Sequence, residues 1–283
     1  MIAVRKSNDR GHYDYGWLNT YHTFSFNEYY DPKYMGFRSL RVINEDRVRP
    51  GTEFPSHSHR DMEIISYVID GELSHKDSMG NGSVIRPGEV QKMSAGRGVM
   101  HSERNNAVDK QTHFLQIWII PSEKGLPPDY QQIRIHEPGR QNNLLLVGSP
   151  NEADAEHVQI NQDAKLYACV LGEGKTTEAH LAEGRHSWVQ VISGEVAVNG
   201  QPLSAGDGAA ISEERQVLFT ALRAAELPFS LRPAPTHSFP QPRTPTGNFR
   251  RSRQVAPPPL PSPVTQGPPH SPLLGPPGSC PLP

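Results

Sequence analysis

Two histidines one residue apart open the strand-like stretch FPSHSHRDMEIISYVIDGEL, residues 54 to 73. Side chains at i and i+2 leave the same face of an extended strand, so His57 and His59 point the same way. A second pair with this spacing, His101 and Glu103, follows the glycine-rich turn in MSAGRGVMHSE. On neighbouring strands, the two pairs would bring three imidazoles and one carboxylate to a common point. That donor set predicts a transition-metal site with coordination positions left for water, substrate or dioxygen.

Short strand-like runs dominate residues 1–232, where apolar or alternating segments are separated by Gly, Pro, Asn and Asp. We expect strands at SLRVI (39–43), EIISYVI (63–69), FLQIWII (114–120), LYACVL (166–171) and WVQVIS (188–193). Helical patterning is weak, with short turns expected only near residues 122–132, a stretch that also looks like a connector between two halves. This spacing is typical of an all-β sandwich or barrel.

One order of features occurs twice in the sequence. The two stretches are YVIDGELSHKDSMGNGSVIRPGEV and VQVISGEVAVNGQPLSAGDGAAI. Each has an apolar strand, a Gly-Glu turn, a second strand and a later Pro-Gly or Ala-Gly-Asp turn. Such an internal echo predicts two copies of one β-unit.

The C-terminal segment differs in composition from the rest of the chain. Of the 28 prolines, 17 lie in residues 233–283, which contain no Asp, Glu or Lys. We expect this segment to be disordered, sampling polyproline II and coil. Its PPPLPSP stretch could bind an SH3 or WW module, but a dispensable extension is the simpler interpretation. The predicted division is therefore an N-terminal unit 1–132 with the metal site, a C-terminal unit 133–232 without metal, and the tail.

Composition excludes several classes of protein. The formal charge of −2 and the pI near 6.7 give no electrostatic footprint for nucleic acid or an anionic membrane. The two cysteines, Cys169 and Cys280, lie in unlike segments, which argues against a disulfide framework and a thiolate zinc site. The N-terminal residues lack the apolar stretch of a secretory signal. We expect a cytoplasmic monomer that contacts neither membrane nor nucleic acid directly.

The histidine motifs resemble those of the cupins. Gly51, His57-x-His59, Glu63 and Gly71 look like the first cupin motif, although Gly71 lies one residue late. His101 and Asn105 look like the second, with SAG (94–96) where the general pattern has Pro-x-Gly. More narrowly, the chain resembles the pirin family through HTFSF (22–26), GFRSLRVINED (36–46), HSHRDMEIISYVIDGELSHKDSMGN (57–81), SAGRGVMHSE (94–103) and LQIWIIPSEKGLPPDYQQ (115–132).

The resemblance to pirins implies a fold and a ligand set. Pirin-like proteins consist of two stacked cupin barrels, that is, double-stranded β-helix jelly rolls. Their N-terminal barrel holds one metal, usually iron, through three His and one Glu. Matched residue by residue, these ligands are His57, His59, His101 and Glu103. The same donors also suit Ni, Co, Mn, Cu or Zn.

The general cupin pattern offers a different carboxylate, Glu63. This residue shares the face of His57 and His59 if the strand runs unbroken. Because the pirin match is longer than the generic motif, we prefer Glu103 as the ligand and assign Glu63 to the strand face or to support of the site.

The second half lacks a comparable donor set. It offers His180 and His186, six residues apart, and ISEERQ (211–216) contains no histidine. We expect no metal there, and we expect Trp188 and Val191 to be core residues. Cys169, within an apolar run, is expected to be an inert buried thiol. His75 and Asp77 are expected on a loop surface.

Two functions follow from the resemblance. The first is a dioxygenase that opens flavonols such as quercetin with O₂ and releases carbon monoxide, with Glu103 as metal ligand and general base. Its partners would be a small aromatic, flavonol-like substrate and O₂. The second is an iron-dependent, redox-sensing regulator that binds a transcription factor or another protein. The acidic body, with 30 Asp and Glu against 24 Lys and Arg in residues 1–232, argues against direct DNA contact in either case.

Overall fold

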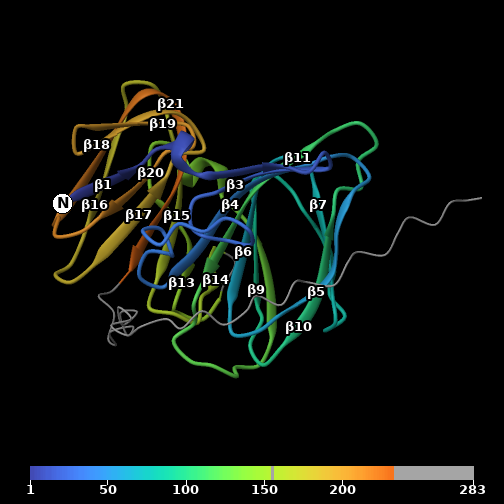
Figure 1. Cartoon of the computed structure of the whole chain (residues 1–283). Helices are drawn as coiled ribbons and strands as arrows, with labels where there is room; N and C mark the ends of the chain where they lie inside the picture. Colours follow the sequence, from blue (N-terminus) through green and yellow to red (C-terminus); the bar gives the residue numbers. More distant parts are fainter. Residues whose placement is uncertain (154–155, 233–283) are drawn as a thin grey trace, which may run out of the picture. The chain divides into compact units, whose positions relative to one another are not determined.

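A computed structural model describes residues 1–153 and 156–232 and shows two β-barrels side by side (Figure 1). Antiparallel strands form the larger sheet of the first barrel in the order β12 (Asp129–Arg134), β9 (Glu89–Ser94), β6 (Glu63–Asp70), β11 (Thr112–Ile119), β4 (Leu40–Val48), β3 (Leu18–His22) and β2 (Gly11–Asp14). Its smaller sheet has the order β5 (Glu53–His59), β10 (Val99–Arg104), β7 (Leu73–Asp77) and β8 (Gly82–Ile85).

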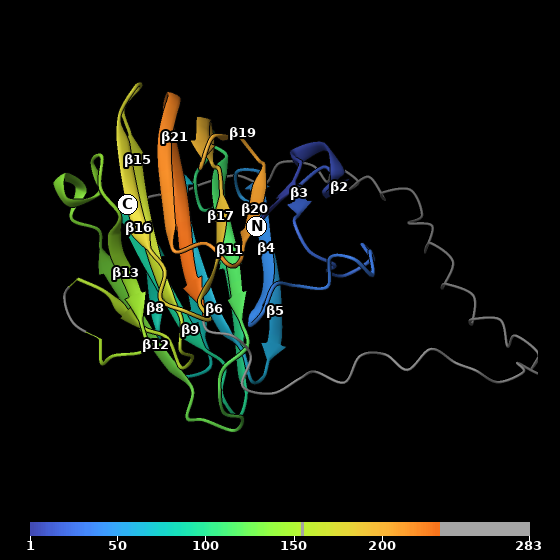
Figure 2. The same ribbon diagram turned by 90° about the vertical axis from the view of Figure 1, so that its left-hand side faces the viewer.

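The second barrel is formed by a separate ten-stranded sheet around one long strand, β21 (Gln216–Arg232), which Figure 2 shows. The main path of this sheet is β1 (Ile2–Arg5), β20 (Gly208–Ile211), β17 (His186–Gln190), β21, β15 (Lys165–Leu171), β13 (Leu145–Ser149) and β14 (Val158–Gln159). Off this path, β16 (Thr176–His180) and β18 (Ser193–Val198) pair with β21, and β19 (Gln201–Ser204) pairs with β18.

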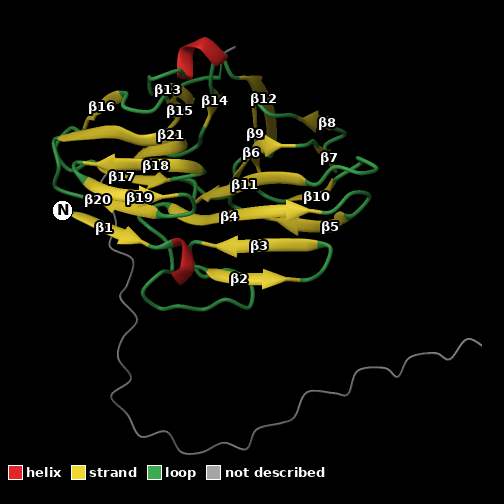
Figure 3. Cartoon of the chain, turned by 90° about the horizontal axis from the view of Figure 1, so that it is seen from above, coloured by secondary structure: helices red, strands yellow, loops and turns green. Residues whose placement is uncertain are grey.

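The prediction of an all-β fold is confirmed. Figure 3 shows strands almost throughout. Across the described parts of the chain, helical structure is limited to the two 3-10 segments η1 (Ser7–Asp9) and η2 (Glu137–Arg140). The strands expected from the apolar runs correspond to β4, β6, β11, β15 and β17.

The central strands of the first barrel are apolar on both faces because both faces are buried. On β11, Phe114 and Trp118 face the barrel interior, whereas Leu115 and Ile117 belong to a cluster that includes Trp188 of the second barrel. The Trp188 ring lies 4.8 Å, centroid to centroid, from that of Phe24. Trp188 is therefore buried as expected, and it packs between the barrels, while Val191 lies in the core of the second barrel.

The internal echo in the sequence corresponds to two equivalent turns. Gly71 begins the β6–β7 turn with φ of 80°, and Gly194 is the second residue of β18, just after the β17–β18 turn, with φ of 77°. A Cβ at Gly71 would lie 2.7 Å from the Gln111 carbonyl oxygen, and one at Gly194 would lie 1.9 Å from that of Ala224. Glycine is required at both turns because any side chain would meet backbone there.

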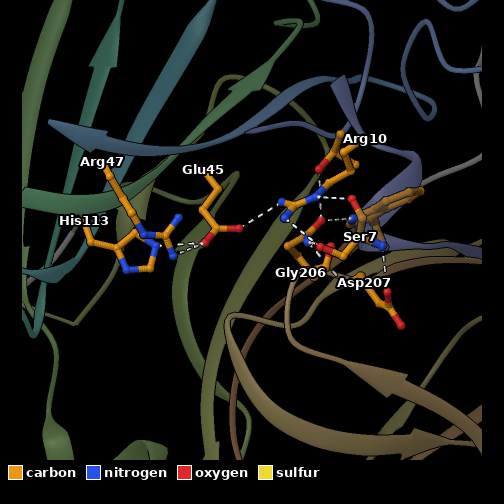
Figure 4. Close-up of polar contacts among 10 residues, drawn as sticks. Ser7, Arg10, Glu45, Arg47, His113, Gly206 and Asp207 are labelled. Carbon is orange, nitrogen blue, oxygen red and sulfur yellow. Dashed lines mark hydrogen bonds and ion pairs between the residues drawn. The ribbon is translucent and has the colours of Figure 1, made fainter. Parts of the chain in front are cut away.

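The segment before β2 ties the two barrels together through polar contacts (Figure 4). Asp207 of the second barrel accepts hydrogen bonds from Lys6 Nζ at 2.8 Å and from the Ser7 amide at 2.7 Å. Arg10, also buried, donates to Glu45 on β4 at 2.9 Å. The N-terminal residues are thus fixed to both barrels.

Strand pairing places some residues differently from the predicted division at residue 132. The first strand, β1, pairs with β20 and so belongs to the second barrel, and β12 continues the first barrel's sheet to Arg134. The stretch 122–132, expected to contain helical turns, instead ends in β12. The predicted disordered tail, residues 233–283, lies outside the described residues. Within those residues, no helix is long and apolar enough to cross a membrane.

Candidate metal centre

The smaller sheet of the first barrel positions the predicted ligands. In the antiparallel register, His101 on β10 lies opposite His57 on β5 and opposite Asp77 on β7. Glu103, two residues further along β10, lies opposite His75. Because side chains alternate along a strand, these residues share the interior face of the barrel.

Three imidazoles meet at one point in the first barrel. Ring nitrogens of His57, His59 and His101 all lie within 4.8 Å of one another. His57 Nδ1 lies 2.7 Å from the Pro55 carbonyl oxygen, so this nitrogen carries the hydrogen and Nε2 presents a lone pair. That Nε2 lies 3.0 Å from Nε2 of His101, whose Nδ1 is buried without a hydrogen-bond partner among the described residues. Converging imidazole lone pairs of this kind fit a divalent transition metal.

Burial keeps the histidines in the form that binds a metal. Burial and then the nearby His57 lower the pKa of His59 to about 4. The same two causes, with smaller contributions from other neighbours, lower the pKa of His101 to about 2. Both rings are therefore neutral near pH 7, and only the neutral imidazole offers a lone pair to a cation.

Glu103 is a buried carboxylate held by two hydrogen bonds. Its Oε2 accepts from Gln116 Nε2 at 2.9 Å, and its Oε1 accepts from Ser66 Oγ at 3.4 Å. Burial outweighs these bonds and raises the pKa of Glu103 to about 7. A nearby cation would offset the cost of this buried negative charge. Glu103 forms its own group of potential donors with His75 and His101, within 4.8 Å of one another, and is not part of the three-histidine group.

Glu63 lies on the other face of its sheet. The strand does not run unbroken: β5 ends at His59, Asp61 has φ of 49°, and Glu63 begins β6 in the larger sheet. Glu63 therefore shares the outward face of β6 with Ile65. Its carboxylate accepts from Ser94 Oγ at 3.0 Å and from the Asn161 amide at 3.2 Å, so it supports the contact with the segment between β14 and β15 of the second barrel.

The expectation that His75 and Asp77 lie on a loop surface was wrong. Both side chains are buried on β7, where the ring of His75 lies 3.1 Å from Asp77 Oδ2. Asp77 also accepts from the backbone amides of Met79 and Asn81 at the turn that follows. Buried positions alternate along β7, but two of them are the polar His75 and Asp77, so the sequence LSHKDS does not show the apolar alternation that indicates a strand.

The predicted ligands lie in a polar layer between two apolar layers. One apolar layer contains Val48, Val68 and Phe114, and the other contains Ile64 and Met93. Between them, a row of polar residues crosses five strands of the larger sheet in register: His22, Asn44, Gln116, Ser66 and Gln91. Their signal in the sequence was a polar residue at an interior position of each strand, which is visible only when the strand pairing is known.

A cavity of about 700 Å³ opens beside the cluster. His57, His59 and Glu103 form part of its wall. The rest is rich in aromatic side chains, including Tyr15, Trp17, Phe26, Phe54 and Trp118. The ring of Trp118 lies 4.9 Å from that of His59, centroid to centroid. A mostly apolar cavity with a few convergent polar groups is typical of a site for a small organic molecule.

A second cavity, of about 490 Å³, lies on the opposite side of the larger sheet and contains none of the clustered donors. Its wall includes Arg10, Glu45 and Arg47, which form the polar network in Figure 4. Burial alone would raise the pKa of Glu45, but hydrogen bonding to His113 and the charge of Arg10 lower it to about 2. This network is an ion-paired support of the fold.

The second barrel has no equivalent cluster within residues 133–153 and 156–232. His180 is exposed beside Glu178, and His186 bonds Ser212 Oγ at 2.8 Å, so the two histidines have separate partners. Cys169 is buried, and burial raises the pKa of its thiol to about 12, as an inert cysteine requires.

Known proteins share both the sequence and the fold. Residues 3–119 match the family model described as Pirin, and residues 146–229 match that of the quercetinase C-terminal cupin domain. Over 218 residues the chain is 44% identical to a quercetin 2,3-dioxygenase of Escherichia coli (strain K12), covering 77% of this chain and 92% of that protein. The chain belongs to the pirin family.

Further relatives agree with this assignment. A putative quercetin 2,3-dioxygenase of Pseudomonas aeruginosa is 40% identical to this pirin over 227 residues, 80% of this chain and 97% of that protein. The crystal structure of bacterial pirin YhhW from Escherichia coli in complex with nickel(II) is 41% identical and has a TM-score of 0.78, covering 83% of this chain and 100% of that chain. The predicted architecture of two cupin barrels is thereby confirmed.

Proposed function

We propose that this pirin is a metal-dependent dioxygenase that opens flavonols such as quercetin with O₂ and releases carbon monoxide. One observation carries the proposal: His57 and His59 of the three-histidine cluster, together with Glu103, line the aromatic cavity of about 700 Å³. The relatives named quercetin 2,3-dioxygenase support it. For the same reason the regulator predicted as an alternative is not favoured. The reaction consumes one O₂ for each carbon monoxide released and needs no external reductant.

The proposed ligands are His57, His59, His101 and Glu103, and iron is the proposed metal. Nickel(II) in the related YhhW structure supports a divalent ion at such a site, and Co, Mn, Cu or Zn would also suit these donors. A divalent metal held here supplies a Lewis acid that lowers the pKa of the flavonol 3-hydroxyl.

Glu103 is the proposed general base. It takes the proton of the 3-hydroxyl onto a carboxylate oxygen, while Gln116 and Ser66 orient the carboxylate through the hydrogen bonds described above. Trp118 Nε1 donates to Gln116 Oε1 at 3.0 Å and so fixes the amide that holds Glu103. The base therefore has a fixed direction before substrate binds.

The aromatic wall would hold the planar rings of the substrate. Phe26 packs edge-on against Trp118, with 5.2 Å between centroids, and Phe54 packs edge-on against Trp17, with 5.1 Å between centroids. These faces offer stacking contacts to a flat aromatic molecule and exclude water from the reacting atoms.

Oxygen consumption tests the proposal. Metal-loaded protein should consume O₂ and release carbon monoxide in equal amounts when quercetin is supplied, and His101→Ala should do neither. Absence of both oxygen uptake and carbon monoxide with a panel of flavonols, at full metal content, would show that the oxygenase proposal is wrong.

A further inference from the structure

Three buried polar atoms in the wall of the aromatic cavity have no hydrogen-bond partner within the described parts of the chain. They are Nδ1 of His22, Oδ1 of Asn44 and Oδ1 of Asp46. Their residues are only 3%, 3% and 4% exposed. Buried polar groups are normally satisfied, so these three atoms are the candidates in this wall for bonds to a molecule in the cavity.

The three residues lie together on two strands. His22 on β3 is directly opposite Asn44 on β4, and Asp46 follows two residues along β4 on the same interior face. Asn44 is in turn opposite Gln116 on β11, one strand spacing away, or about 5 Å. The unsatisfied atoms thus lie beside the residue that orients Glu103.

The two parts of the polar row differ in how they are satisfied. Gln116 and Ser66 use their donors on Glu103, so this part of the row is fixed. Asn44 and His22, at the other end, line the cavity, and each keeps a buried polar atom without a partner among the described residues. The satisfied part supports the base, and the unsatisfied part is available to a ligand.

We propose that Asn44, Asp46 and His22 form a subsite that hydrogen-bonds to the ring hydroxyls of a polyhydroxylated aromatic substrate. The inference rests on the proposed flavonol oxygenase and specifies which flavonols it takes. A substrate with ring hydroxyls can supply partners to these atoms, whereas one without ring hydroxyls leaves the buried polar atoms unpaired. The site therefore selects hydroxylated rings.

Equilibrium binding under anaerobic conditions separates recognition from turnover. The probes are quercetin, which has four hydroxyls besides the reacting one, and 3-hydroxyflavone, which has none. Binding to the metal-loaded protein can be followed by quenching of Trp17 and Trp118, which line the cavity. The parent should bind quercetin at least about tenfold more tightly than 3-hydroxyflavone, as expected for loss of one or more bonds to buried groups.

Variants then locate the discrimination. Asn44→Leu and, separately, Asp46→Asn should reduce the ratio of the two affinities severalfold, mainly because the affinity for quercetin falls. Asn19→Leu is the matched control, because Asn19 lies on β3 with its side chain on the opposite face, bonded to Asp14. It should leave the ratio at the parent value. If Asn44→Leu does not fold, the affinity ratio of Asp46→Asn, compared with that of the parent, still tests the subsite.

The outcomes distinguish the subsite from the oxygenase itself. Two results would overturn the subsite even if both flavonols are turned over. One is a parent that binds quercetin and 3-hydroxyflavone equally tightly. The other is an equal loss of affinity for both ligands in the Asn44 and Asp46 variants. Discrimination that is lost in the variants supports it. If the parent discriminates between the two flavonols but consumes no oxygen with either, the subsite still binds hydroxyls, and the proposed reaction is wrong.

Discussion

Replacing Glu103 by Gln separates the charge of the carboxylate from its shape. Both oxygens of Glu103 accept hydrogen bonds, from Gln116 at 2.9 Å and from Ser66 at 3.4 Å. A glutamine amide has one acceptor oxygen, so it can keep the shorter bond from Gln116 and turn its amino group toward Ser66, whose hydroxyl can accept. We therefore expect a folded protein that loses about 1 kcal/mol of stability or less.

Catalysis should suffer far more than stability. A positioned general base contributes about 10² to 10⁴ in rate, or about 3 to 5 kcal/mol of barrier. Metal-reconstituted Glu103→Gln should therefore consume O₂ with quercetin at least about 100-fold more slowly than the parent. An oxygen electrode gives the rates, and elemental analysis of the same samples expresses them per bound metal.

Glu63→Gln provides the matched control, since it makes the same chemical change at another buried carboxylate of the first barrel. Glu63 accepts from Ser94 and Asn161, so its loss should lower stability by about 1 to 3 kcal/mol and leave metal content and turnover close to those of the parent. If Glu63→Gln loses metal and activity while Glu103→Gln keeps both, the choice of carboxylate is wrong.

Three other perturbations test separate parts of the structure. The Glu45 pKa is lowered from 4.5 to about 2, so Glu45 should contribute about 3 kcal/mol to the free energy of unfolding above pH 4.5, and this contribution should be lost as the pH falls toward 2. A stability difference between parent and Glu45→Gln that does not change with pH in urea unfolding would refute this. Gln116→Leu should lower metal affinity or turnover about 10- to 100-fold in chelator competition and oxygen assays, because Glu103 loses its orienting donor, and parent-like values for both would contradict that role. Ending the chain after residue 232 should leave melting temperature and metal content nearly unchanged, since the removed sequence has little apolar periodicity, and a large drop in melting temperature would contradict this.

Local spacing was enough to predict the two same-face pairs from which the candidate metal site is built. The alternation of side chains along a strand places His57 with His59, and His101 with Glu103, on one face each. The strands themselves were also predictable, because their apolar runs are bounded by turn residues. Only the pairing of β5 with β10, which joins the two faces, required the resemblance to a known fold.

Other features depend on where strands end and which strands pair. Glu63 would share the face of His57 and His59 only on an unbroken strand, and this condition fails because the chain turns at Asp61 and enters another sheet. His75 was assigned to a loop because its strand, β7, is short and partly polar. The row of His22, Asn44, Gln116, Ser66 and Gln91 is scattered over 95 positions of sequence, from residue 22 to residue 116, and becomes one feature only through the register of five strands.

The central claim is that three histidines of the first barrel bind one metal, and metal content tests it most directly. Protein purified without a histidine tag or metal column should contain a stoichiometric divalent transition metal by elemental analysis. His57→Ala and His101→Ala should each lose that metal while keeping the β-rich circular dichroism spectrum, because the apolar layers around the site do not depend on the ion. Full metal occupancy in either variant would contradict the account.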